Sequence, residues 1–82
     1  MIVSTGPSRT PSRVLAHLLK MADGYLAARA AYQAMAIYFE VLEKHSGTQE
    51  AGRAHERLLE IADDYEKAGE FHQARSIYER ML

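Results

Sequence analysis

The side chains best suited to chemistry are four histidines and a small group of acids. No histidine has a second His or Cys three or four residues away, the spacing that places two metal ligands on one helix face. Glu60, Asp63 and Asp64 can attract a cation only weakly, because an open acidic helix face sets no coordination geometry. The sequence also has no glycine-rich phosphate loop and no nucleophile elbow. These patterns predict a protein that is not an enzyme and needs no cofactor or metal. The histidines are His17, His45, His55 and His72.

Composition narrows the class of partner. The 82 residues carry a formal net charge of −1 at pH 7, which provides no general attraction to nucleic acid or anionic lipid. Cysteine is absent, which excludes disulfides and fits a reducing compartment. No apolar run approaches the length of a membrane span. We therefore expect a cytoplasmic protein that binds proteins or peptides, with no nucleic acid and no membrane among its partners.

An internal repeat organises most of the chain. Residues 18–42 and 58–82 lie forty positions apart and are identical at eleven of twenty-five positions. The shared residues are mostly apolar and three or four apart, a spacing typical of amphipathic helices. Gly69 interrupts the pattern in the second copy. Each copy is therefore predicted to form two short helices that fold back on each other.

Small and aromatic residues recur at fixed places in both copies. In the second copy these places hold Leu58, Ile61, Ala62, Tyr65, Gly69, Phe71, Ala74, Tyr78 and Met81. In the first copy they hold Leu18, Met21, Ala22, Tyr25, Arg29, Ala31, Ala34, Tyr38 and Val41. With these residues, both copies resemble the tetratricopeptide repeat. The resemblance implies an all-α fold of antiparallel helical hairpins, stacked as a short right-handed superhelix, and a role in protein–protein interaction.

The predicted organisation is a flexible tail over residues 1–10 and a single helical domain over residues 11–82. Repeat one covers about 11–46 and repeat two about 48–82, with Thr48 as the N-cap of its first helix. The segment from Ala27 to Ala31 must turn if the repeat is to close. Its residues favour helix, so one long helix from Pro11 to about His45 is an alternative. That alternative predicts a domain-swapped dimer.

One difference between the copies predicts a self-association surface. Four positions on the second helix of each copy face away from the expected core. They are polar in the second copy and mostly large and apolar in the first, which indicates a contact with a second copy of the chain as a homodimer or larger homo-oligomer. The alternative is that the tail, through Ile2 and Val3, covers them. The predicted surface is Tyr32, Met35, Ala36 and Phe39, matched in the second copy by His72, Arg75, Ser76 and Glu79.

The resemblance also implies a concave groove along the first helix of each repeat. Its carboxylates suit a basic or amphipathic peptide, as in a small chaperone-like regulator, and the alternative is an ordinary solvated helix face. A third interpretation is that the chain is a fragment of a longer repeat array. The predicted groove residues are Leu19, Asp23, Leu26, Leu59, Asp63 and Glu66.

Overall fold

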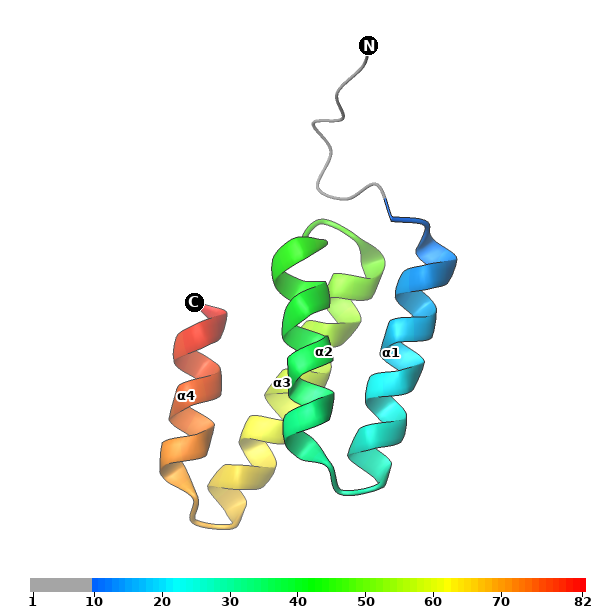
Figure 1. Cartoon of the computed structure of the whole chain (residues 1–82). Coiled ribbons are helices and arrows are strands. Elements are labelled where there is room, and N and C mark those ends of the chain that lie inside the picture. Colours follow the sequence, from blue (N-terminus) through cyan, green and yellow to red (C-terminus); the bar gives the residue numbers. More distant parts are fainter. Residues whose placement is uncertain (1–9) are drawn as a thin grey trace.

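Four α-helices make up the part of the chain that the computed structural model describes, residues 10–82 (Figure 1). The expected all-α class is confirmed, and no strand occurs among these residues. Most of the expected tail, including Ile2 and Val3, lies outside the described residues. The helices are α1 Ser12–Ala27, α2 Ala31–Lys44, α3 Gln49–Lys67 and α4 Phe71–Met81.

The first hairpin turns at Arg29. α1 ends two residues before Arg29 and α2 begins two residues after it, so the predicted turn is confirmed and the single long helix is wrong. Arg29 has a φ of 64°, in the left-handed region. Gly69, forty residues later, turns the second hairpin with a φ of 80°. Arg29 therefore takes the place of a glycine, although left-handed backbone costs a residue with a Cβ roughly 1–2 kcal/mol.

The two turns have the same pattern of backbone hydrogen bonds. In each, the residue with positive φ donates its amide to the carbonyl three residues earlier, at 3.0 Å for Arg29 and 2.9 Å for Gly69. The next residue donates to the carbonyl five residues earlier, at 2.8 Å in both turns. Helices commonly end on a left-handed residue in this way, because its amide and the next one satisfy carbonyls of the last turn. The repeat in sequence is thus a repeat in backbone geometry.

α3 begins at the predicted cap. The hydroxyl of Thr48 accepts a hydrogen bond from the amide of Ala51 at 3.1 Å, which satisfies one of the unpaired donors in the first turn of the helix. Gly47, just before it, has a φ of 86° and reverses the chain after α2. The connection between the two hairpins is therefore short.

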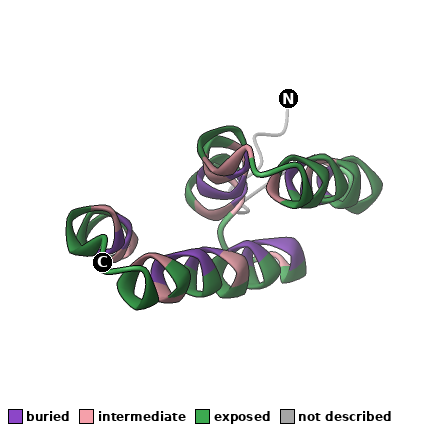
Figure 2. Ribbon diagram, turned by 90° about the horizontal axis from the view of Figure 1, so that it is seen from below, coloured by how far each residue is buried: buried purple, intermediate pink, exposed green. Residues whose placement is uncertain are grey.

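Most of the buried residues form one hydrophobic cluster, to which all four helices contribute. Four buried alanines occupy matching places in the two hairpins: Ala22 and Ala34 in the first, Ala62 and Ala74 in the second. Such small side chains let the two helices of a hairpin approach closely. Figure 2 shows that the buried sides of the helices turn toward one another. One core therefore holds both hairpins.

The helices do not have equal numbers of neighbours. α1 packs mainly on α2, and α4 packs on α3. α3 packs on both α2 and α4 and also touches α1. α2 and α3 therefore occupy the middle of the arrangement, while α1 and α4 lie at its two ends (Figure 1).

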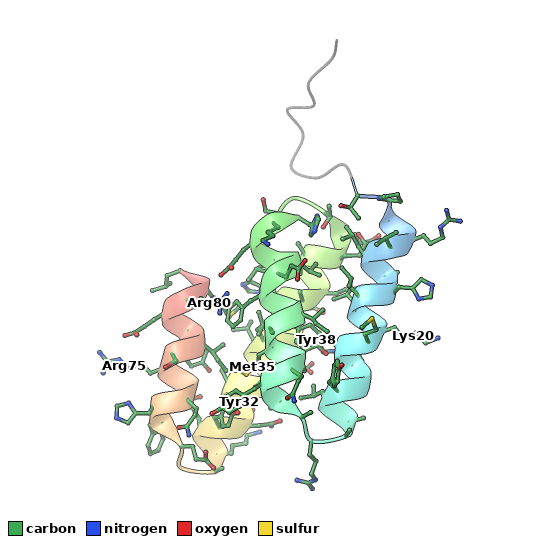
Figure 3. The ribbon with its side chains drawn as sticks, viewed as in Figure 1. Lys20, Tyr32, Met35, Tyr38, Arg75 and Arg80 are labelled. Atoms are coloured by element: carbon green, nitrogen blue, oxygen red, sulfur yellow. The ribbon has the colours of Figure 1, made fainter. Side chains whose placement is uncertain are left out.

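Arg80 ties α4 to α2. Its guanidinium donates two hydrogen bonds to the Glu43 carboxylate, at 2.9 Å and 3.1 Å. The same group lies 4.1 Å from the centre of the Phe39 ring, a favourable position for a cation over an aromatic face. Two planar groups on α2 are thus bound by one side chain of α4, and Figure 3 shows Arg80 reaching toward α2.

The turn predicts a stabilising substitution. Arg29→Gly should raise the free energy of unfolding by about 1 kcal/mol, because glycine adopts positive φ without steric cost. Gly69→Ala is the matched control and should lower it by about 1 kcal/mol. No atom outside the local backbone lies within 4 Å of a Cβ built on Gly69, so that loss would reflect backbone conformation alone. Urea unfolding followed by circular dichroism measures both, and an Arg29→Gly chain no more stable than the original would contradict this account.

The Arg80 contact predicts a dependence on acid. The hydrogen bond from Arg80 is the main cause that lowers the pKa of Glu43. A carboxylate with a lowered pKa stabilises the fold above its ordinary pKa, and this contribution is lost as pH falls through the folded-state value. Between about pH 6 and about pH 3, the melting temperature of the wild type should therefore fall further than that of Glu43→Gln. Glu79→Gln removes an ion pair within α4 and serves as the control. Equal falls for Glu43→Gln and the wild type would refute the prediction.

Candidate protein-binding surfaces

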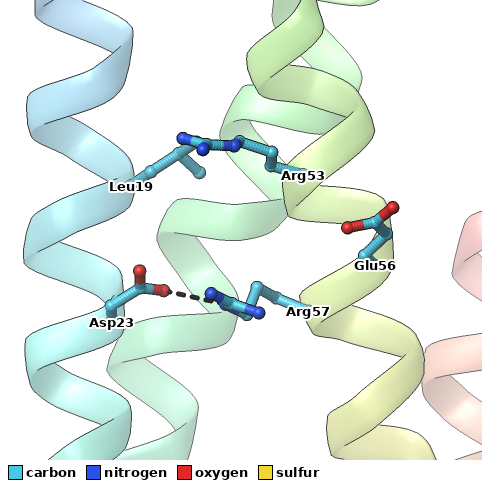
Figure 4. Close-up of a pocket in the computed structure, with 5 residues that line it drawn as sticks. All are labelled: Leu19, Asp23, Arg53, Glu56 and Arg57. Carbon is cyan, nitrogen blue, oxygen red and sulfur yellow. Dashed lines mark hydrogen bonds and ion pairs between the residues drawn. The ribbon is translucent and has the colours of Figure 1, made fainter.

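A triad of polar side chains joins the two hairpins. The hydroxyl of Tyr38 on α2 donates a hydrogen bond to the Asp23 carboxylate on α1. Arg57 on α3 donates to the same carboxylate oxygen at 3.2 Å (Figure 4). Burial, together with the nearby Asp23 carboxylate, raises the pKa of the Tyr38 phenol. Tyr38 therefore keeps its proton and acts as the hydrogen-bond donor in this contact.

A groove runs between α1 and α3 around this triad. Its larger hollow has a volume of about 340 Å³, and a second hollow continues it along Leu26 and Glu60. The two hollows share Asp23 and Arg57. Three of the predicted groove residues, Leu19, Asp23 and Leu26, line them.

The groove carries both signs of charge, so the expectation of an acidic groove needs correction. Arg53 and Arg57 line it together with Asp23, Glu56 and Glu60. The sequence interpretation missed the two arginines because it took matching family positions from each copy. A signal was present: Arg53 and Arg57 are one helical turn apart and so lie on one face of α3.

The other three predicted groove residues lie elsewhere on α3 and do not line these hollows. Asp63 pairs with Lys67 at 2.9 Å. Glu66 accepts a hydrogen bond from Tyr78 at 3.2 Å, and Leu59 is 39% exposed. They lie forty residues after Leu19, Asp23 and Leu26. α3 covers those three residues of α1, but no described helix covers their counterparts on α3. The six residues therefore form two surfaces.

The predicted self-association surface on α2 is also divided. Tyr32 is 67% exposed and Ala36 is exposed. Met35 is half-buried against the core, and Phe39 is only 2% exposed. Arg80 of the same chain covers the Phe39 ring. Phe39 is thus a core residue of this chain, which corrects the expectation that all four side chains face outward.

The reason lies in the position of each helix. α2 has neighbours from both hairpins, whereas α4 lies at an end of the arrangement. The same repeat position is therefore buried on α2 and exposed on α4, as Phe39 and Glu79 show. Comparing the two copies revealed a difference in burial, and the sequence interpretation took it for a difference in partner binding.

An exposed apolar stripe lies on α1 instead. Val14, Met21 and Tyr25 are 43%, 52% and 41% exposed, and Leu18 between them is half-buried. Their spacing of four, three and four residues places them on one side of the helix. We call these four residues the α1 stripe. The sequence gives no sign that these residues are exposed, because residues with the same spacing on α3 lie in the core.

The comparison with α3 shows why the α1 stripe is exposed. The positions forty residues later are Ala54, Leu58, Ile61 and Tyr65. The first three are buried and Tyr65 is half-buried. α3 packs extensively on α2 as well as on its own hairpin partner α4, whereas α1 packs extensively only on its hairpin partner α2 and makes a smaller contact with α3. Within residues 10–82, Leu18 of the α1 stripe packs against the core, and the other three residues are more exposed than their counterparts on α3.

The described residues give no indication of other kinds of site. No group of three or more His, Cys, Asp or Glu residues within 10–82 is placed to hold a metal ion. Over the same residues, no helix combines the length and the apolar character needed to cross a membrane. The hydrophobic surface on α1 and the mixed-charge groove are two features that a ligand could use.

Comparison of the chain with protein-family models, with curated proteins and with solved structures gave no match. Function is therefore inferred from the surfaces of this chain itself.

The triad predicts an order of stability losses. Tyr38→Phe should lower the free energy of unfolding by about 1 kcal/mol, because it removes one hydrogen bond and leaves the Asp23 and Arg57 pair. Asp23→Ala should cost more, about 1–3 kcal/mol, because it leaves the buried Tyr38 hydroxyl without its acceptor. Tyr78→Phe is the matched control at the exposed end and should change stability little. Chemical unfolding of the three variants tests this, and a Tyr38→Phe loss as large as that of Asp23→Ala would count against it.

Proposed function

We propose that this chain is a non-catalytic protein–protein interaction module that self-associates. It is built from two helical hairpins of tetratricopeptide-like form, stacked as the start of a right-handed superhelix. Matching turns at Arg29 and Gly69, with matching hydrogen bonds, support the two-repeat interpretation. Matched buried alanines in both hairpins support it further.

The observation that carries the proposal is the α1 stripe. Repeat units of this kind bury their hydrophobic faces by stacking on neighbours, and the end faces of a stack must be covered or polar. The counterparts of the stripe on α3 are covered by α2, while Val14, Met21 and Tyr25 remain more than 40% exposed. Full burial of a large apolar side chain is worth roughly 1.5–3 kcal/mol. Covering the stripe with another helix would therefore favour association.

Peptide binding in the groove between α1 and α3 is a second candidate. The hollow of about 340 Å³ beside Leu19 supports it. Because Arg53 and Arg57 line the groove with Asp23, a peptide there would need carboxylates as well as cations. A purely basic peptide would meet two arginines. The groove therefore favours a peptide with both acidic and basic side chains, and not the basic peptide that its acids alone suggested.

Light scattering over a concentration series tests self-association. The wild type should show a mass that rises above the 9.2 kDa of one chain. Met21→Glu should reduce the mass to that of a monomer, because a charge on the α1 stripe cannot be buried without a partner. Tyr32→Glu, on the exposed part of α2, is the matched control.

The results identify which surface makes the contact between copies. A loss of mass in Met21→Glu but not in Tyr32→Glu would place the contact on α1. The reverse result would return the contact to the α2 surface around Tyr32. A wild type that stays monomeric at every concentration would show the self-association proposal to be wrong.

A further inference from the structure

The contact between α3 and the first hairpin is a template for a contact that the chain leaves open. In this contact α3 lies against α2, and Arg57 reaches the Asp23 carboxylate on α1, which also holds Tyr38. The first hairpin thus supplies the acceptor side, with an acid and a tyrosine. α3 supplies the docking side, with an apolar face and a cation.

The outer side of the second hairpin repeats the acceptor side. Asp63 and Tyr78 lie forty residues after Asp23 and Tyr38. A hollow of about 310 Å³ lies on this side of the hairpin, lined in part by Glu66, Phe71 and Tyr78. The residues forty positions before those that line this hollow are all buried or half-buried in the first hairpin. We call this surface the α4 face and define it by Asp63, Glu66, Phe71, Tyr78, Glu79 and Leu82.

α1 repeats the docking side. The α1 stripe matches the face with which α3 enters the core. His17 lies forty residues before Arg57, so it occupies the position of the cation that reaches the acid. Arg13 and His17 line a shallow surface hollow with Lys20. Figure 3 shows Lys20 pointing away from the other helices on one side of the molecule and Arg75 doing so on the opposite side.

The two surfaces have complementary charge. Arg13, His17 and Lys20 lie on the exposed side of α1. In the register of the repeat, His17 takes the place of Arg57, which lines hollows with Asp23 and Leu26, so it would lie beside Asp63 and Glu66 on the α4 face. Arg13 takes the place of Arg53 and would lie beside Leu59, the counterpart of Leu19. Two acids of the α4 face form ion pairs within the chain, Glu79 with Arg75 at 2.8 Å and Asp63 with Lys67 at 2.9 Å, and Glu66 accepts a hydrogen bond from Tyr78. They can therefore lie at an interface without leaving an unpaired charge.

From these observations we infer that the partner of the α1 stripe is the α4 face of a second copy of this chain. The inference rests on the proposed self-association and specifies its geometry. α1 of one copy takes the place that a third repeat would occupy on the other copy. His17 of the first copy then lies beside Asp63 and Tyr78 of the second. This contact joins two different surfaces, so it does not close on itself and can add copies end to end.

Mixing two blocked chains tests this geometry. Met21→Glu blocks the α1 stripe and leaves the α4 face intact. Phe71→Glu blocks the α4 face and leaves the stripe intact; Phe71 is 67% exposed, so the fold should tolerate the change. Each variant alone should be a monomer by light scattering, and an equimolar mixture should form one dimer of twice the 9.2 kDa chain mass. The wild type should grow beyond a dimer as its concentration rises.

Several outcomes would overturn the head-to-tail geometry, and they can be told apart from a failure of self-association itself. If one blocked variant still dimerises alone, the contact joins two identical surfaces. If both variants assemble like the wild type, it lies elsewhere on the chain. If the wild type assembles but the mixture stays monomeric, head-to-tail docking is wrong while self-association stands. A monomeric wild type would overturn both, and the end faces would then belong to another protein or to further repeats.

A charge exchange tests the register independently. His17→Asp should weaken association severalfold, because it places two acids together across the contact. Asp63→Lys should weaken it as well, because it removes the carboxylate that accepts from the His17 ring. A mixture of the two variants brings the new acid on α1 of one chain against the new lysine on the α4 face of the other, and it should regain association. Circular dichroism of each variant establishes that it is folded. Loss of association in both variants without recovery on mixing would refute the pairing of His17 with Asp63.

Discussion

The structure depends on the packing of α3 against the first hairpin. Without it, each hairpin would have a hydrophobic face open to water, and a chain of 82 residues has little apolar burial to spare. The contact combines an apolar seam, in which Leu58 is fully buried, with the hydrogen bonds of Asp23 to Tyr38 and Arg57. The apolar seam provides the free energy, and the polar triad fixes how far along the seam the two hairpins meet.

Stacking gives equal sequence positions unequal environments. Val14 and Ala54 hold the same place in the repeat, yet one is 43% exposed and the other is fully buried. Phe39 and Glu79 differ in the opposite sense, since the middle helix has the aromatic residue and the end helix has the acid. A two-repeat stack has two ends, and here the ends differ: the α1 end presents apolar residues with Arg13 and Lys20, while the α4 face presents Phe71 and Tyr78 with three acids, one of them paired with Arg75. This asymmetry is the physical basis of the proposed head-to-tail contact.

Several local features follow from the sequence because they depend on near neighbours in the chain. Thr48 caps α3 and Gly69 ends it, since both act through backbone groups a few residues away. The turn at Arg29 was predicted only through its match to Gly69, because the residues around it favour helix. The groove was predicted in part: Leu19, Asp23 and Leu26 line it, but Arg53 and Arg57 come from a helix whose rotation against α1 is a property of the packed molecule.

The sequence by itself determined the helical periodicity, the turn at Gly69 and the forty-residue repeat, because periodicity and backbone conformation are encoded over short distances. It left the turn between Ala27 and Ala31 open against one long helix. It could not determine which copies of the repeated face are covered. Met35 and Phe39 resemble a binding surface until Arg80, about forty residues later, is seen to lie over the Phe39 ring. The α1 stripe resembles a core face until α1 is seen to lie at an end. Tertiary structure decided both, because exposure depends on which helices are neighbours in space.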